Sequence, residues 1–199
     1  MSTALALAND GLDFFGIEYH VPKRARICRV ARGSPGSGES SGSRNLDLYI
    51  PHNPLIKRRK VERYIPHLAT TGFHEVLHCV RSEVINKEET LRDTCASEGI
   101  AHIAEARFIK LLLPANEQDS MVVPPWDIEL QAELLDVMDM DEGEPYSYDA
   151  WFDNLGTDIY PAAGVSLGVL AVQRKVDAGY EIADIITMPT EEILDLAAA

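Results

Sequence analysis

We expect the first fifty residues to be extended, because polar and apolar residues alternate with a period of two in parts of this stretch. Residues 17–21 and 26–32 are two candidate strands, and residues 46–50 form a third, which Pro51 ends. Residues 33–43, with the sequence GSPGSGESSGS, contain too few apolar groups to pack, so we expect a flexible loop there.

After residue 53 the apolar residues recur at helical spacing, and start and stop signals divide this part of the chain into several helices. The first covers about residues 53–84 and is restarted or kinked at Pro66. The next covers about residues 90–113 and begins with Thr90 and Asp93, which have the spacing of a capping box. Further helices are expected at residues 126–137, 161–178 and 189–196.

Strands that precede a run of helices, with no regular alternation of the two, are typical of α+β proteins. We therefore predict an α+β fold in which a small N-terminal mixed sheet packs on a mainly helical body. Residues 1–199 are expected to form a single domain, in which residues 33–43 are a loop and the acidic residues 136–149 are a connector.

Glycines mark places where helices are expected to approach each other closely. Gly99 has no side chain and would let the helix at 90–113 press against the preceding helix. Gly164 and Gly168 are four residues apart in the late helix, so they would lie on one side of it and admit another backbone.

The net charge of −14 argues against two classes of function. A nucleic-acid-binding protein needs a basic face to displace counterions from phosphate, and an anionic membrane surface would repel this chain. The basic residues 57–60 are better explained as a solvated helix face.

No apolar run approaches the length of a membrane span, and residues 1–13 lack the basic start of a signal peptide. The three cysteines form no disulfide framework and favour a reducing cytoplasm.

The clearest chemical motif is His74-Glu75-Val76-Leu77-His78, an H-E-x-x-H sequence within a helical pattern. Residues four apart lie on the same face of a helix, so His74 and His78 can offer two imidazole nitrogens to a single Zn²⁺. Glu75 is rotated by one residue and cannot easily be a third ligand, but it can take a proton from a water on the metal. The motif therefore predicts a metal site with Glu75 as the general base.

A catalytic zinc ion needs a third protein ligand and keeps its fourth position for water. Glu98 follows His78 by 20 residues, which is enough for a turn and an antiparallel return. It shares a helix face with His102 and Glu105, and this helix must be partly buried, where a carboxylate requires a cation or several donors. Glu98 is therefore the first candidate for the third ligand, and His102 is the second. Cys95 lies one turn before Glu98 and is better explained by packing.

These residues also carry a family resemblance. The segments FHEVLHCVR (73–81), TL (90–91) and SEGIA (97–101) resemble the H-E-x-x-H-x-x-R … E-G-[IL]-A pattern of the predicted zinc-dependent proteases. These proteases are a bacterial domain-of-unknown-function family of the gluzincin type. Residues 160–164, 167–168 and 188–194 are similar to the late helix and the closing Pro-x-x-Glu-Ile-Leu segment of that family, so the resemblance covers roughly residues 44–196.

The resemblance implies a zincin-like fold, in which His74, His78 and Glu98 bind zinc and Glu75 is the catalytic carboxylate. The family commonly carries a tyrosine after the glycine of the late helix, and this chain has Val165 there. If that tyrosine stabilises the oxyanion in the family, this chain must use another group, such as Tyr160 or His102.

The sequence therefore predicts a zinc-dependent metallopeptidase that binds one Zn²⁺ per chain and hydrolyses a peptide or protein substrate with a Glu-activated, zinc-bound water. Two alternatives remain. One is a catalytically silent, zincin-like regulatory or binding protein in which the metal is structural. The other is an interaction protein without a metal, which uses its acidic surface and its C-terminal helices.

Overall fold

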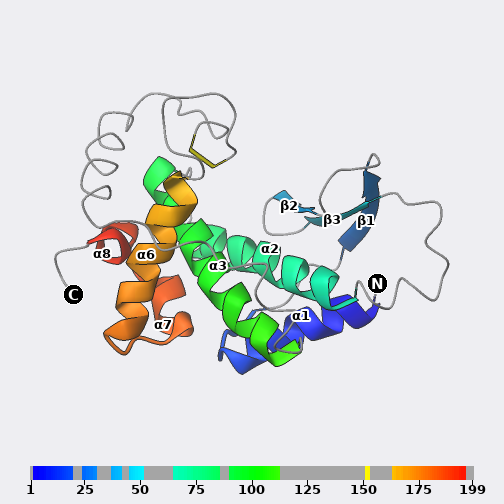
Figure 1. Cartoon of the computed structure of the whole chain (residues 1–199), viewed down its shortest axis with the longest axis horizontal. Coiled ribbons are helices and arrows are strands. Elements are labelled where there is room, and N and C mark those ends of the chain that lie inside the picture. Colours follow the sequence, from blue (N-terminus) through cyan, green and yellow to red (C-terminus); the bar gives the residue numbers. More distant parts are fainter. Residues whose placement is uncertain are drawn as a thin grey trace. The chain divides into compact units, whose positions relative to one another are not determined.

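The computed structural model of the chain describes residues 2–19, 24–30, 37–41, 45–51, 65–85, 90–112, 151–152 and 163–195. The helices in these ranges are α1 (Ser2–Phe14), α2 (Ile65–Ile85), α3 (Leu91–Leu112), α6 (Ala163–Asp177), α7 (Ile182–Thr187) and α8 (Thr190–Leu194) (Figure 1). The strands are β1 (Arg24–Val30), β2 (Ser37–Ser41) and β3 (Asn45–Pro51). The helix expected at 126–137, the helix start at 53 and the connector at 136–149 lie outside the described residues.

The predicted α+β class is wrong, because the described part of the chain is mainly helical. Helices α2 and α3 contain 21 and 22 residues, whereas β1, β2 and β3 contain only 7, 5 and 7. Among the described residues, strand pairing is confined to these short segments, in the order β1-β3-β2, with β1 parallel and β2 antiparallel to β3. These three short strands are too small to form a layer comparable in size to the helices.

Two local expectations for the first fifty residues are also wrong. Residues expected to be extended form α1, whose sequence STALALANDGLDF is rich in alanine and leucine, which are good helix formers. The segment expected to be a flexible loop contains β2, because pairing with β3 uses backbone groups and does not require apolar side chains. Helix α7 was not predicted from the sequence.

The chain divides into two compact units, and α3 contributes residues to both. One unit comprises Met1–Val84 and Ala104–Ser120, and the other comprises Ile85–Ile103 and Met121–Ala199. The organisation of residues 1–199 as a single domain stays a prediction.

Aromatic packing holds the helices of the first unit together. The ring of Phe73 on α2 stacks on Phe15 with a centroid distance of 5.6 Å and contacts Phe108 of α3 at 4.8 Å. Gly11 of α1 lies against the same ring, since a Cβ atom there would be 2.9 Å from Phe73 Cδ2. Because Phe73 is fully buried and directly precedes His74, this packing fixes the part of α2 that carries the H-E-x-x-H motif.

Helices α3 and α6 cross in the second unit, and glycines lie where the two backbones come closest. A Cβ atom on Gly168 would lie 2.8 Å from the carbonyl carbon of Cys95 and would overlap its oxygen. The expectation that a backbone approaches Gly168 closely is therefore confirmed. Gly164 instead faces the ring of Phe152. The expectation for Gly99 is wrong, because its nearest neighbours belong to Gly168 of α6 rather than to α2.

A capping box begins α3, as the sequence predicts. The backbone N–H of Asp93 donates to Thr90 Oγ1 at 3.1 Å, and the backbone N–H of Thr90 donates to Asp93 Oδ2 at 3.2 Å. The hydroxyl group of Thr190, at the start of α8, donates to Asp93 Oδ1. Asp93 is fully buried, so one carboxylate both caps α3 and ties the C-terminal helix to it.

We expect the Asp93→Ala substitution to lower the free energy of unfolding by about 2 kcal/mol, since it removes a helix cap and leaves the buried hydroxyl of Thr190 without its acceptor. Urea denaturation followed by circular dichroism measures this loss. The Thr190→Val substitution removes only the second interaction and should cost about 1 kcal/mol. Equal losses in the two variants would contradict the double role of Asp93.

Candidate metal centre

Helix α2 brings the two histidines of the motif together. His74 and His78 are one helical turn apart, and their Nε2 atoms lie 3.0 Å from each other. Two nitrogens bound at 2.0–2.1 Å to the same tetrahedral zinc ion are about 3.3 Å apart. The observed separation is close to that value, so small ring rotations would let both imidazoles bind one ion.

The other ring nitrogen of His74 faces a carboxylate. His74 Nδ1 lies 3.1 Å from Glu105 Oε2, and the two side chains are only 13% and 8% exposed. An ionised carboxylate can only accept a hydrogen bond, so Nδ1–H is the donor in this contact. A neutral His74 then has its lone pair on Nε2, the atom that faces His78.

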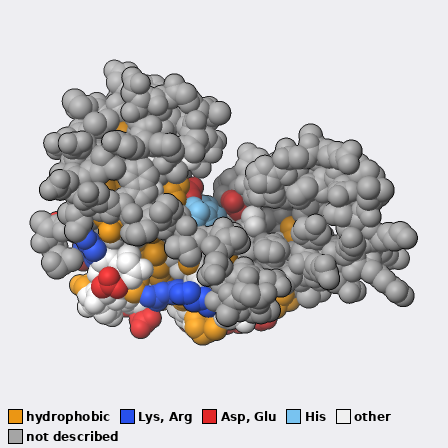
Figure 2. Space-filling view, viewed as in Figure 1, with side chains coloured by type: hydrophobic (Ala, Val, Ile, Leu, Met, Phe, Trp, Pro, Cys, Tyr) orange, Lys and Arg blue, Asp and Glu red, His pale blue; other side chains and the backbone are white. Residues whose placement is uncertain are grey.

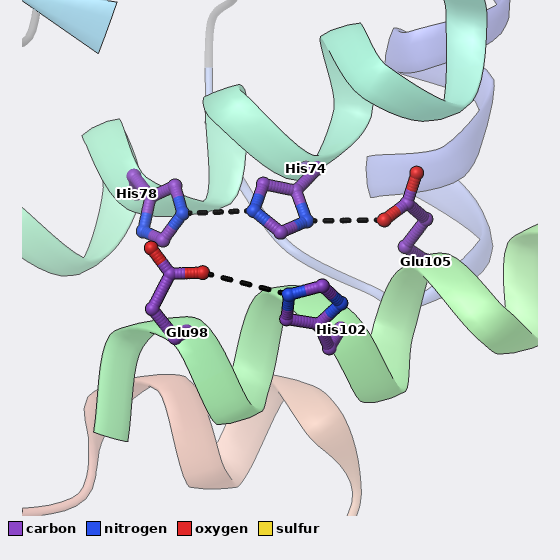
Figure 3. Close-up of polar contacts among 5 residues, drawn as sticks. All are labelled: His74, His78, Glu98, His102 and Glu105. Carbon is purple, nitrogen blue, oxygen red and sulfur yellow. Dashed lines mark hydrogen bonds and ion pairs between the residues drawn. The ribbon is translucent and has the colours of Figure 1, made fainter. Parts of the chain in front are cut away.

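In the part of the chain that the structure describes, two groups of three side chains have ligand atoms that all lie within 4.8 Å of one another. The first contains His74, His78 and Glu98, and the second contains His74, His102 and Glu105. Figure 3 shows these five side chains, with the first two histidines on α2 and the other three residues on α3. The first group is the ligand set predicted from the sequence; that it binds a metal stays a prediction.

Glu98 has the surroundings of an acidic ligand. It is only 9% exposed, and its Oε2 atom lies 3.7 Å from His102 Nε2, one turn further along α3. A carboxylate with so little access to water is stabilised by nearby positive charge or by donors. The chemistry of the donor set, two imidazoles and one carboxylate, therefore fits Zn²⁺ with one position left for water.

Glu75 belongs to neither group of candidate ligands. It is buried, with 9% of its surface exposed, and it follows His74 directly on α2, which turns it by about 100° around the helix axis. That Glu75 is not a metal ligand stays a prediction. Its role as general base stays a prediction.

Three further residues bear on the predicted site: Cys95, Val165 and Tyr160. Cys95 is fully buried and belongs to neither group. Burial, and to a lesser extent the charge of Glu98, raise the pKa of the Cys95 thiol far above its usual range, which opposes a thiolate ligand. Val165, where the resemblance expects tyrosine, is buried in α6. Tyr160 lies outside the described residues.

The contact between Glu105 and His74 was missed in the sequence. The sequence places Glu105 on the same helix face as Glu98 and His102 but indicates no partner for it on α2. The available signal was the spacing: in an antiparallel return, a residue later in α3 lies beside a residue earlier in α2. Glu98 would then be near His78, and Glu105 near His74.

The cluster is partly accessible to solvent. Figure 2 shows histidine side chains at the surface of the described residues, next to acidic side chains. The side chain of His102 is 30% exposed and that of Glu98 is 11% exposed. A water or a small ligand can therefore reach these groups.

Comparison of the chain with protein-family models, with curated proteins and with solved structures finds no match. Within the described residues, none of the helices combines the length and the apolar character that a membrane span requires.

Proposed function

We propose that this chain is a zinc-dependent metallopeptidase in which His74, His78 and Glu98 hold the metal and Glu75 is the general base. One observation carries the proposal: two imidazole Nε2 atoms lie 3.0 Å apart, and Glu98 belongs to the same group of mutually close ligand atoms. The H-E-x-x-H sequence supplies a carboxylate directly beside these ligands.

When bound, Zn²⁺ would lower the pKa of a water toward about 7 and polarise the carbonyl group of the scissile bond. Glu75 takes the proton of the attacking water and passes it to the leaving amine. His102 is 30% exposed and its Nε2 atom lies 3.7 Å from Glu98 Oε2, so we assign its imidazole as the donor to the developing oxyanion. The substrate is a peptide or a protein.

The resemblance to the predicted zinc-dependent proteases supports the same assignment, because its quoted segments contain all four residues. Cys79 and Cys95 are both buried and neither forms a disulfide, which supports our proposal that the enzyme works in the reducing cytoplasm.

The proposal is tested by metal content and metal removal. Purified protein should contain one zinc ion per chain by elemental analysis, lose peptidase activity after chelation and regain it with added Zn²⁺. The His78→Ala variant should lose zinc, whereas His102→Ala should retain it. Wild-type protein that binds no divalent metal with either assay would refute the proposed function.

A further inference from the structure

Glu105 contacts His74, one of the proposed metal ligands, but it does not belong to the ligand group of His74, His78 and Glu98. Its carboxylate lies 3.1 Å from Nδ1 of His74, on the far side of the ring from Nε2. Both side chains are largely buried, which strengthens the hydrogen bond between them. Figure 3 shows the resulting chain of contacts from Glu105 through His74 to His78.

This hydrogen bond determines which nitrogen of His74 is available. A neutral imidazole has one N–H group and one lone pair, and a carboxylate at Nδ1 keeps the proton there. The lone pair is then on Nε2, which lies 3.0 Å from Nε2 of His78. Without the carboxylate, His74 would populate both tautomers and its ring would be less firmly oriented.

The two candidate ligand groups share His74 and compete for it. In the first group, Nε2 of His74 faces Nε2 of His78, whereas Glu105 of the second group faces Nδ1 of His74. A neutral imidazole cannot serve both groups, because one nitrogen retains its proton. The observed hydrogen bond therefore selects between them.

We propose that Glu105 is a positioning residue, which directs Nε2 of His74 to the ion held with His78 and Glu98 and excludes a second ion at His102. This inference rests on the metal site of the proposed function but not on its peptidase activity. Residues that orient a metal-binding histidine typically contribute 10- to 100-fold to metal affinity.

The test compares zinc affinity, by competition with a chromogenic chelator, among wild-type protein, Glu105→Ala, Glu105→Gln and His102→Ala. We expect Glu105→Ala to bind zinc about 10- to 100-fold more weakly. Glu105→Gln should lose less, because its amide oxygen still accepts from Nδ1–H and its shape preserves the packing. His102→Ala should stay within about threefold of wild type, and all four proteins should bind at most one ion.

Nitrogen NMR of the histidine rings provides a readout that a purely structural role would not change. In zinc-free wild-type protein, His74 should carry its proton on Nδ1, and in zinc-free Glu105→Ala both tautomers of His74 should be populated. Unchanged affinity in both Glu105 variants would overturn the inference alone. A second bound ion that disappears in Glu105→Ala and in His102→Ala would also overturn it, by making Glu105 a ligand. Wild-type protein without zinc would overturn the proposed function as well.

Discussion

Replacement of Glu75 by glutamine is expected to lower kcat/KM for peptide hydrolysis by about 100- to 10,000-fold while the protein still binds one zinc ion. Glutamine has nearly the same size, so it fits the buried position, but its amide group cannot take a proton from water. Because Glu75 is in neither group of candidate ligands, its loss should leave the metal in place. Hydrolysis of a fluorogenic peptide and elemental analysis of the same sample measure the two effects.

The Glu83→Gln substitution is a matched control on the same helix. Glu83 is an exposed residue of α2 whose carboxylate accepts a hydrogen bond from the hydroxyl of Tyr19, away from the candidate ligands. The Glu83→Gln substitution removes the same charge as Glu75→Gln and should leave peptide hydrolysis unchanged. Full activity in Glu75→Gln, together with a His74→Ala variant that no longer folds, would instead favour a binding protein with a structural metal. Loss of zinc in Glu75→Gln would make Glu75 a ligand.

The ends of two helices could be predicted because their signals are local. Thr90 and Asp93 are three residues apart and satisfy each other's backbone groups without any help from distant residues. Gly179 ends the late helix with a φ of 98°, and the N–H of Tyr180 bonds to the carbonyl of Lys175. Such a bonding pattern requires only that a glycine follow the helix.

The partners of distant residues could not be predicted in the same way. Gly99 indicates that a backbone comes close, but it does not say which backbone, and the structure shows α6. Helix α1 replaces the expected extended N-terminus because the alternation is limited to residues 17–21, whereas the alanine- and leucine-rich residues before them favour a helix. That helix is held by Phe73 and Phe108, which lie far away in the sequence.

The same difference between local signals and distant contacts decides which parts of the candidate site could be predicted. The proximity of His74 and His78 follows from helix geometry alone, since residues four apart share a face. The position of Glu98 required an assumption about the return of the chain. Glu105 was missed because a helix face does not specify the register between two helices, and only that register brings Glu105 to His74 rather than to solvent.

The Gly168→Ala substitution is expected to lower the free energy of unfolding by about 3 kcal/mol, the upper end of the usual cost of overpacking. The added methyl group would overlap the carbonyl oxygen of Cys95, and backbone atoms cannot rotate away as a side chain can. Helices α3 and α6 must therefore separate, and α3 carries Glu98 directly before Gly99, the residue that contacts Gly168. Zinc affinity should fall together with stability.

Two further glycines separate this steric effect from other costs of adding a methyl group. Gly16 has a φ of 68° and no atom within 4 Å of a built Cβ, so Gly16→Ala should cost only about 1 kcal/mol of backbone strain. Gly164→Ala meets the ring of Phe152, a side chain that can shift, and should cost less than Gly168→Ala. Urea denaturation and chelator competition rank the three variants. If Gly168→Ala were as stable as Gly16→Ala, α3 and α6 would not cross as closely as described, and Glu98 would not depend on that crossing for its position.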